Sequence, residues 1–456
     1  MKILLIKPEV VGVFSYTNQV EHEPLELEYL YTVCRDRGHE PVIYDRRYEH
    51  MAFAEKMRRE KPDVVCVSGY ITQQKLMMKL ALEAKKCDRS VRVILGGSNV
   101  EINYENYYES KADYLYIASG LEGFGKLIDY IDARKRGDRS KTLKEIEGIC
   151  YRRKGEWIVN PARVETPEDL PVPDRSFFYA NKEKFAYLKF RPLALVKNSF
   201  SCRKKCNFCF CTNRNSGRYA SRTVENLVNE IESLEVPCIH ITDDDFLTDR
   251  EFLLEFARLL RERNIKKQYL IYGRADFIAE NEDVIKILAE VGLSLVMVGL
   301  EAISDDELDS YNKRTSAAQN EECVRILHKY GVYCAGLFIV HQKMTRKDFG
   351  KLYRYIKKRP IFPTISVFTP MQGSRIYDEY KDEMITGDAT KQDLFHCLLK
   401  PEHMSLTEFM IRYYILSAKA MMCRRNDSLY GSINVPAALL YAAKSFALKI
   451  RRRIIF

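Results

Sequence analysis

Short apolar runs alternate with amphipathic stretches along the first 130 residues. The apolar runs are rich in β-branched side chains, and the stretches between them repeat their apolar positions with helical spacing. Strands and helices that alternate in this way predict a parallel sheet covered on both faces. The predicted strands are residues 1–6, 40–44, 63–68 and 91–95, and the predicted helices are residues 25–37 and 73–86.

The same alternation returns after residue 190 and continues for about 150 residues. Repeated strand and helix units predict a partial or complete (β/α) barrel, whose functional groups gather at the carboxyl ends of the strands. The predicted strands are residues 193–196, 238–242, 269–272, 293–298 and 332–340, and the predicted helices of this part are 224–234, 250–262, 282–290 and 318–330. A further helix is predicted over residues 405–422, beyond the barrel.

These patterns divide the chain into four parts of an α/β protein. Residues 1–135 form a doubly wound parallel-sheet domain, and residues 136–190, charged and interrupted by prolines, form a linker with a hairpin near residues 151–157. Residues 191–370 form the (β/α) partial barrel, and residues 371–456 form a helical region that ends in a basic tail.

Composition narrows the class of protein. The 456 residues are 46% hydrophobic and carry 73 basic against 63 acidic side chains, which excludes a disordered chain and a disulfide-held mini-protein. No stretch approaches the roughly 18 apolar residues of a membrane-spanning helix, and the N-terminus lacks the features of a signal peptide. We therefore expect a cytoplasmic protein, in which most of the 13 cysteines are reduced core residues.

Four cysteines crowd into ten residues, and three of them, Cys202, Cys206 and Cys209, have the spacing CxxxCxxC. Thiolates on one loop bind zinc or an iron–sulfur cluster. Structural zinc prefers two separated pairs of ligands, whereas three cysteines on a [4Fe–4S] cluster leave one iron open. Cys211 is a bystander if the loop is extended, because its side chain would then point away from Cys209, or else the fourth ligand of a closed site.

Small residues follow several of the predicted N-terminal strands. Ligands of parallel sheets bind beyond the carboxyl ends of the strands. The alternative is that these residues only make tight turns. They are Ser68, Gly69, Gly96, Gly97, Ser98 and Gly120.

The triplet, which follows a predicted strand and has Phe208 before its third cysteine, closely resembles the defining motif of the radical S-adenosylmethionine (SAM) superfamily. The resemblance implies that Cys202, Cys206 and Cys209 hold a [4Fe–4S] cluster, with Phe208 beside SAM. It implies that SAM chelates the fourth iron and that an electron, from a reductant such as flavodoxin or ferredoxin, cleaves SAM to a 5′-deoxyadenosyl radical.

Polar residues after the barrel strands fit the same resemblance. It places Asp243 and Asp244 at the amine of SAM, Arg274 at its carboxylate and Glu301 near its ribose. The alternatives are that one of the three aspartates 243–245 caps the next helix and that Glu301 pairs with Arg274. His341, after a later strand, is either structural or faces the substrate.

The N-terminal pieces ILLIKP, VSG, ILGGS and ASGLEGFGKLI resemble the cobalamin-binding domain that precedes many radical SAM enzymes. This resemblance implies that six small residues contact cobalamin: Ser68, Gly69, Gly96, Gly97, Ser98 and Gly120. The chain lacks the DxHxxG motif by which other cobalamin proteins supply a histidine to cobalt. Cobalamin-binding domains attached to radical SAM domains commonly lack this motif too.

We therefore expect a cobalamin-dependent radical SAM C-methyltransferase that acts on an unactivated carbon of a small-molecule or lipid-like substrate. The alternatives are a radical SAM enzyme of cyclisation or carbon–carbon coupling, and a non-catalytic metal-binding scaffold. Basic residues interleave with apolar ones in residues 444–456, which predicts either peripheral contact with the inner membrane surface or an ordinary solvated helix end. No arrangement of basic and aromatic residues predicts nucleic-acid binding.

Overall fold

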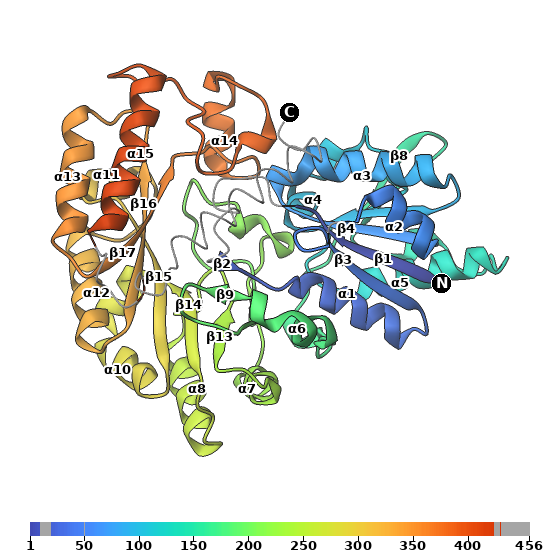
Figure 1. The fold of residues 1–456 in the computed structure, drawn as a ribbon, viewed down its shortest axis with the longest axis horizontal. Coiled ribbons are helices and arrows are strands. Elements are labelled where there is room, and N and C mark those ends of the chain that lie inside the picture. The colour runs from blue at the N-terminus through green and yellow to red at the C-terminus, as the bar shows by residue number, and fades with distance from the viewer. Residues whose placement is uncertain (10–19, 50, 424–428, 430–456) are drawn as a thin grey trace.

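The structure of the protein is a computed structural model that describes residues 1–9, 20–49, 51–423 and 429. Two α/β units lie side by side, and the N-terminal unit occupies the right of Figure 1. The barrel-like unit occupies the left, with its helices on the outside. This arrangement confirms the fold class expected from the sequence.

The N-terminal sheet has seven strands in the order β3-β1-β4-β5-β6-β7-β8. The first five run parallel, and their order is that of the flavodoxin-like sheet, with the chain reversal between β1 and β4. Ligands of such sheets bind beyond the carboxyl ends of the strands near this reversal. The bounds are β1 Lys2–Lys7, β3 Glu40–Asp45, β4 Val64–Ser68, β5 Arg92–Gly96 and β6 Tyr114–Tyr116.

Helices cover both faces of this sheet because its strands are apolar on both faces. Alternate residues of β1 belong to two separate buried clusters, Leu4 and Ile6 to one and Ile3 and Leu5 to the other. The helices are α1 Leu25–Asp36, α2 Phe53–Glu60, α3 Gln74–Cys87, α4 Ser98–Asn103 and α5 Glu122–Lys135.

The segment expected as a linker extends the N-terminal sheet. Its hairpin, β7 Ile149–Arg153 and β8 Glu156–Asn160, was expected near residues 151–157 and pairs antiparallel onto β6. Residues up to 160 therefore belong to the first sheet. The segment then forms α6 Ser176–Asn181 and β9 Ala186–Tyr187, which pairs with β2 Val20–Glu21.

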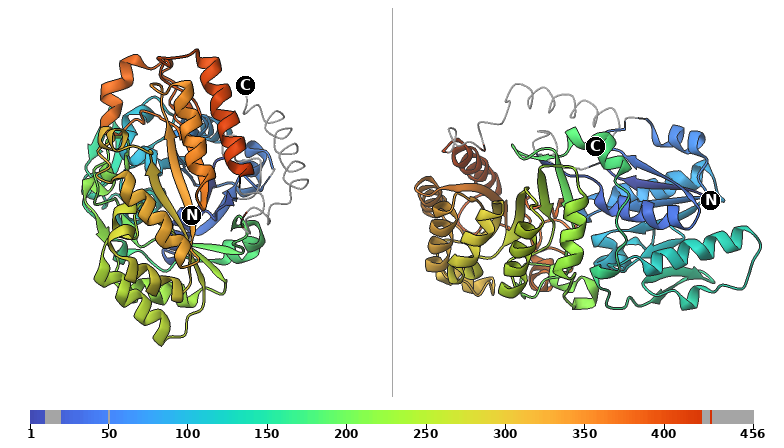
Figure 2. Two further views of the ribbon diagram at one scale, coloured as in Figure 1. Left: turned by 90° about the vertical axis from the view of Figure 1, so that its left-hand side faces the viewer. Right: turned by 90° about the horizontal axis from the view of Figure 1, so that it is seen from below.

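The second unit is an open barrel of six parallel strands in sequential order, β10-β13-β14-β15-β16-β17. Figure 2 shows it from two further sides. The strands are β10 Leu193–Val196, β13 Cys238–Ile241, β14 Gln268–Gly273, β15 Leu293–Glu301, β16 Tyr333–Val340 and β17 Ile361–Val367. The helices that follow them are α7 Val224–Ser233, α8 Arg250–Glu262, α9 Ala275–Glu280, α10 Glu282–Glu290, α11 Asp305–Ser310, α12 Ala317–Lys329 and α13 Arg346–Lys357.

Two helices beyond β17 complete the described structure. They are α14 Arg375–Tyr380 and α15 Leu406–Met422, and α15 packs on α13 and β17. None of the described helices has the length and apolar composition needed to cross a membrane. The basic tail expected to contact a membrane, residues 444–456, lies outside the described residues.

A buried arginine joins the two units. Arg175 contacts carboxylates on both sides, Glu23 at 2.8 Å and Glu28 at 3.3 Å from the N-terminal unit and Glu230 of α7 at 2.8 Å. It also donates to the carbonyl of Leu195 at the barrel edge. Burial raises the pKa of Glu28 well above its usual value, and neighbouring Glu23 adds to the shift. The guanidinium thus neutralises a buried acidic cluster at the junction.

Replacing Arg175 with methionine should destabilise this junction strongly. The substitution leaves buried carboxylates without their cation, at a cost of about 3–5 kcal/mol. Differential scanning calorimetry should show a melting temperature several degrees lower than that of the wild type. The control is Arg35→Met, which removes a half-exposed ion pair with Asp174 worth at most about 1 kcal/mol. Equal melting temperatures for the two variants would contradict the assignment.

Candidate functional site

The loop that carries Cys202, Cys206 and Cys209 leaves the carboxyl edge of the barrel after the short strand β11, Ser199–Phe200. Hydrogen bonds from other segments fix it at several points. The amide of Asn207 donates to the carbonyl of Tyr311 at 3.1 Å, and Asn312 Nδ2 donates to the carbonyl of Lys205 at 2.7 Å. These two hydrogen bonds define the backbone that carries the three cysteines.

The three thiols are free and partly exposed. In the described part of the chain, no three His, Cys, Asp or Glu side chains converge closely enough to hold one metal ion. A [4Fe–4S] cluster does not require such convergence, because each cysteine binds a different iron. Arg274 Nη1 lies 3.8 Å from Cys206 Sγ. Burial raises the pKa of the Cys206 thiol, while Lys313 and Arg274 oppose that rise, so this donor set fits an anionic cluster.

Cys211 contacts Cys209, although an extended loop would separate their side chains. The chain enters a single 3-10 turn at Cys211–Asn213 instead of continuing in an extended conformation. A hydrogen bond from Cys211 lowers the pKa of Cys209, and the pKa of Cys211 rises well above its usual value. Cys211 is therefore placed to donate a hydrogen bond to the sulfur of Cys209.

Asp243 is occupied by the protein itself. Its oxygens accept hydrogen bonds from the amides of Asn198 and Ser199, at 2.9 and 2.8 Å, and from Asn198 Nδ2 at 2.9 Å. It thus fixes the turn between β10 and β11, which leads into the cysteine loop, rather than offering a free carboxylate to SAM. The expected capping role of the aspartate triplet is wrong, since Asp249 caps α8 by accepting from the amide of Phe252.

Asp244 and Asp245 have free carboxylate oxygens. One oxygen of Asp244 and both of Asp245 are buried without a hydrogen-bond partner. Burial raises the pKa of Asp245 to about 7, and Arg274 and Lys313 oppose the rise. Unpartnered buried carboxylates are costly, so these oxygens fit an ammonium group of a bound ligand. The third aspartate of the triplet was the available sequence signal for Asp245, and the sequence analysis did not assign it to the SAM site.

Arg274 and Glu301 lie close to the cysteine loop but do not pair with each other. Arg274 contacts Asp276 at 2.9 Å and donates to the carbonyl of Lys313 at 2.6 Å. Glu301 pairs instead with Lys313 Nζ at 2.8 Å, so the expected alternative of a Glu301–Arg274 ion pair is wrong. Lys313 is buried in a loop without a recognisable motif, which explains why sequence analysis missed it.

The ring of Phe208 anchors the cysteine loop to a neighbouring apolar cluster. Its ring meets Tyr311 edge to face at 5.6 Å and packs against a cluster that includes Phe368. Lys313 Nζ lies 6.0 Å from the same ring, so Phe208 borders the charged site on its apolar side.

His341 pairs with Glu307, at 3.1 Å between Nε2 and Oε1, which favours its structural interpretation. A second histidine pair was not foreseen. His22 and His240 lie with ring centroids 5.1 Å apart, and their pKa values are lowered by burial, that of His22 to about 4. No local sequence pattern predicts this pair, because the two residues are distant in the chain.

A cavity of about 220 Å³ lies between the N-terminal sheet and the barrel. Ser98, one of the expected cobalamin contacts, lines it, and so does Phe210, which directly follows Cys209. The edge of the first sheet and the cysteine loop therefore face one space. The cavity is lined by Tyr70, Ile71, Thr72, Ser98, Asn99, Ile102, Asn103, Phe210, Met371, Gln372, Gln392, Asp393 and Leu394.

The glycines expected at cobalamin have different surroundings. A Cβ on Gly97, at φ +100°, would collide with the backbone of Gly69, and Ser68 Oγ lies close to the same point. The amide of Gly69 donates to the carbonyl of Gly96, so the two turns pack directly against each other. These contacts fit the interpretation of the glycines as tight turns, and Ser98 is the member of this set that lines the cavity.

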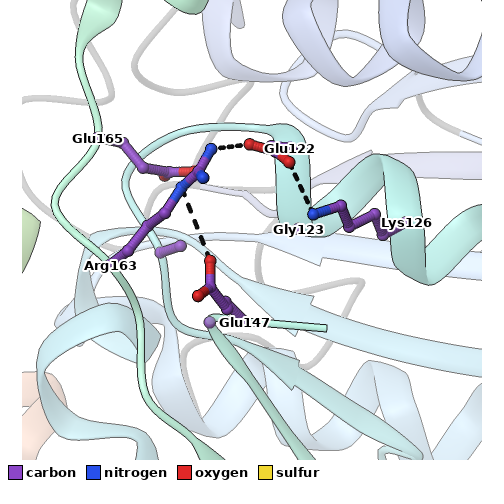
Figure 3. A pocket seen from close by; sticks show the side chains of 8 residues that line it. Glu122, Gly123, Lys126, Glu147, Arg163 and Glu165 are labelled. Atoms are coloured by element: carbon purple, nitrogen blue, oxygen red, sulfur yellow. Dashed lines mark ion pairs between the residues drawn. The ribbon is translucent and has the colours of Figure 1, made fainter. Parts of the chain in front are cut away.

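Gly120 is covered by a carboxylate. Its amide donates to Glu165, where a Cβ would collide. Figure 3 shows Glu165 beside Arg163, which points toward Glu122 and Glu147. The structure therefore assigns the amide of Gly120 to a protein contact rather than to a free ligand site.

Glu101 of α4 links the two edges. Its carboxylate accepts hydrogen bonds from Arg214 Nε at 3.2 Å, from the amide of Asn215 at 2.7 Å and from Ser119 Oγ. Arg214 and Asn215 follow the cysteine loop, whereas Ser119 follows β6. The helix that lines the cavity is thus tied directly to the segment after the three cysteines.

Both units of the structure match domains of known proteins. Residues 199–356 match the radical SAM superfamily, and residues 13–128 match the B12 binding domain. The hopanoid C-3 methylase of Methylococcus capsulatus is 25% identical over 415 residues, which are 90% of this chain and 78% of the methylase. The anaerobic magnesium-protoporphyrin IX monomethyl ester cyclase of Cereibacter sphaeroides is 24% identical over 377 residues, which are 79% of this chain and 60% of the cyclase.

Among solved structures, the radical SAM methyltransferase TsrM of Kitasatospora setae, with cobalamin and a [4Fe–4S] cluster bound, has the same fold. Its TM-score is 0.64 at 17% identity, over 90% of this chain and 85% of TsrM. The two domain matches confirm the cofactors expected from the sequence, a [4Fe–4S] cluster, SAM and cobalamin. With its cysteine loop on a six-stranded barrel and a B12-binding sheet facing that loop, the chain belongs to the cobalamin-dependent radical SAM enzymes.

Proposed function

We propose that the protein is a C-methyltransferase that acts on an unactivated carbon of a small-molecule or lipid-like substrate. The observation that carries this proposal is the shared cavity, because Ser98 at the edge of the B12-binding sheet and Phe210 after Cys209 line the same space. Methyl transfer needs the corrin and the SAM site to reach one substrate. The similarity to the hopanoid methylase supports the same conclusion.

When bound, the cluster and SAM supply a radical that abstracts hydrogen, and cobalamin supplies a methyl group. The chain's own residues position and shield this chemistry. Cys202, Cys206 and Cys209 provide the thiolates, and Arg274 lies beside Cys206 as a neighbouring cation. Asp244, with a buried unpartnered oxygen, is placed to accept the ammonium of SAM.

Asp245 and Glu301 complete the polar side of the site. Asp245 offers two further buried oxygens next to Asp244. Glu301 is held by its buried ion pair with Lys313, at 2.8 Å. Phe208 and Tyr311 cover the opposite side with apolar rings and reduce the access of water.

The partners follow from the same chemistry. The cluster requires a one-electron reductant, such as flavodoxin or ferredoxin, and the substrate is a small molecule. Contact of residues 444–456 with a membrane stays a prediction from the sequence. A second candidate function is radical cyclisation, which the similarity to the magnesium-protoporphyrin ester cyclase favours.

Anaerobic reconstitution with iron, sulfide and cobalamin tests the proposed function. With SAM that carries a deuterated methyl group, we expect 5′-deoxyadenosine together with transfer of the deuterated methyl group to the substrate, measured by mass spectrometry. Formation of 5′-deoxyadenosine with a product that gains no methyl group would favour cyclisation. The absence of any SAM cleavage by the reduced, cluster-loaded protein would overturn both.

Replacing Cys209 with alanine should remove the cluster, whereas Cys211→Ala should retain it, because Cys211 acts as a hydrogen-bond donor to Cys209. Iron and sulfide analysis after reconstitution measures both. A shift in the electron paramagnetic resonance of the reduced Cys211→Ala protein is expected, since hydrogen bonds to sulfur tune such clusters. Loss of the cluster in Cys211→Ala would show a closed four-cysteine site.

Replacing Asp244 with asparagine should weaken SAM binding by about 10- to 100-fold, the range of a lost charge-assisted hydrogen bond of about 1.5–3 kcal/mol. Equilibrium dialysis with the cluster-loaded protein measures the affinity, and iron content should stay unchanged. Asp249→Asn is the matched control, because Asp249 caps α8. Equal affinities in the two variants would refute the assignment of Asp244.

A further inference from the structure

Three consecutive cations separate the first two cluster ligands. Arg203, Lys204 and Lys205 are exposed, with 44% of the Arg203 side chain and 43% of the Lys204 side chain accessible to solvent. Together with exposed Arg314, we call them the basic patch. Three of these charges lie on the loop between Cys202 and Cys206. Arg314 lies on the neighbouring segment, whose Asn312 donates a hydrogen bond to that loop.

The basic patch is held in place by its backbone. Asn312 Nδ2 donates to the carbonyl of Lys205 at 2.7 Å, and Arg314 Nε lies 3.4 Å from Asn312 Oδ1. The guanidinium of Arg203 stacks on the ring of Tyr219 at 4.4 Å. The side chains thus project from a fixed surface next to the cluster ligands rather than from a free loop.

In the described part of the chain, two of the four cations of the basic patch have an acidic partner. Asp249 lies 3.9 Å from Arg203, and Asp276 lies 3.4 Å from Lys204 but is already paired with Arg274. Helix α11 carries Asp305, Asp306, Glu307 and Asp309, and the amide of Asn312 donates to the carbonyl of Asp309 at 2.9 Å. Glu307 pairs with His341. A run of charges that only contacts water can lie anywhere on the surface. Arg203, Lys204 and Lys205 instead lie between Cys202 and Cys206, two of the proposed cluster ligands.

We propose that the basic patch is the docking surface for a small acidic one-electron carrier protein, and that the electron enters the cluster there. This inference rests on the proposed function. The carrier is oxidised by one electron and the cluster held by Cys202, Cys206 and Cys209 is reduced by one, with no bond formed or broken and no proton moved. Opposite charges steer such weak encounters, which are therefore fast and sensitive to salt.

The test compares the wild type with Arg203→Glu/Lys205→Glu in the cluster-loaded full chain. Isothermal titration with an acidic flavodoxin at low salt should show binding at least 10-fold weaker in the variant. Wild-type affinity should fall with rising salt, while the affinity of the variant should depend on salt much less. The matched control, Arg89→Glu/Lys111→Glu, reverses two exposed charges of the N-terminal unit and should bind like the wild type.

Two small reductants of opposite charge separate docking from chemistry. SAM cleavage driven by dithionite or by reduced methyl viologen should be within 2-fold of the wild type in both variants, whereas cleavage driven by flavodoxin should fall at least 10-fold only in Arg203→Glu/Lys205→Glu. Equal flavodoxin binding in all three proteins would overturn the docking surface. Loss of SAM cleavage with every reductant, at unchanged iron content, would also overturn it, since the residues would then serve the chemistry itself. A wild type that cleaves no SAM would instead count against the proposed function.

Discussion

The carboxylate of Asp243 determines where the cysteine loop begins. It accepts hydrogen bonds from two consecutive backbone amides, those of Asn198 and Ser199, at the point where the chain leaves β10. A buried carboxylate with several N–H donors is stable only in this geometry, so the turn has little freedom. Every ligand of the cluster lies within eleven residues of that turn, and its position relative to the barrel depends on this contact.

The second constraint is the junction between the units. Arg175 joins carboxylates of α1 and α7, and Glu101 joins α4 to the segment after the cysteines. The contact of Glu101 lies beside the cavity, whereas the contacts of Arg175 lie in another part of the interface. The contacts of Arg175 are buried and the contact between Glu101 and Arg214 is partly buried, so sliding of one unit against the other would leave charges unpaired. These contacts therefore hold the edge of the N-terminal sheet at a fixed position relative to the cysteine loop.

The polar site divides its residues between fixed and free groups. Asp243, Arg274 and Glu301 each have partners within the protein, whereas Asp244 and Asp245 keep buried oxygens without partners. Such unsatisfied groups are uncommon in folded proteins, and each needs an explanation. Under the proposed function, the ammonium group of SAM would supply the missing partner for Asp244 and Asp245.

The sequence by itself determined the elements and predicted the metal ligands. Apolar periodicity placed α8 and α10 at their observed bounds, and the spacing of Cys202, Cys206 and Cys209 indicated a cluster because ligands close in sequence share a loop. Only the tertiary structure decided which polar groups are free. Pairs such as Glu301 with Lys313, Gly120 with Glu165 and His22 with His240 join distant segments, and no local pattern records the distance between them.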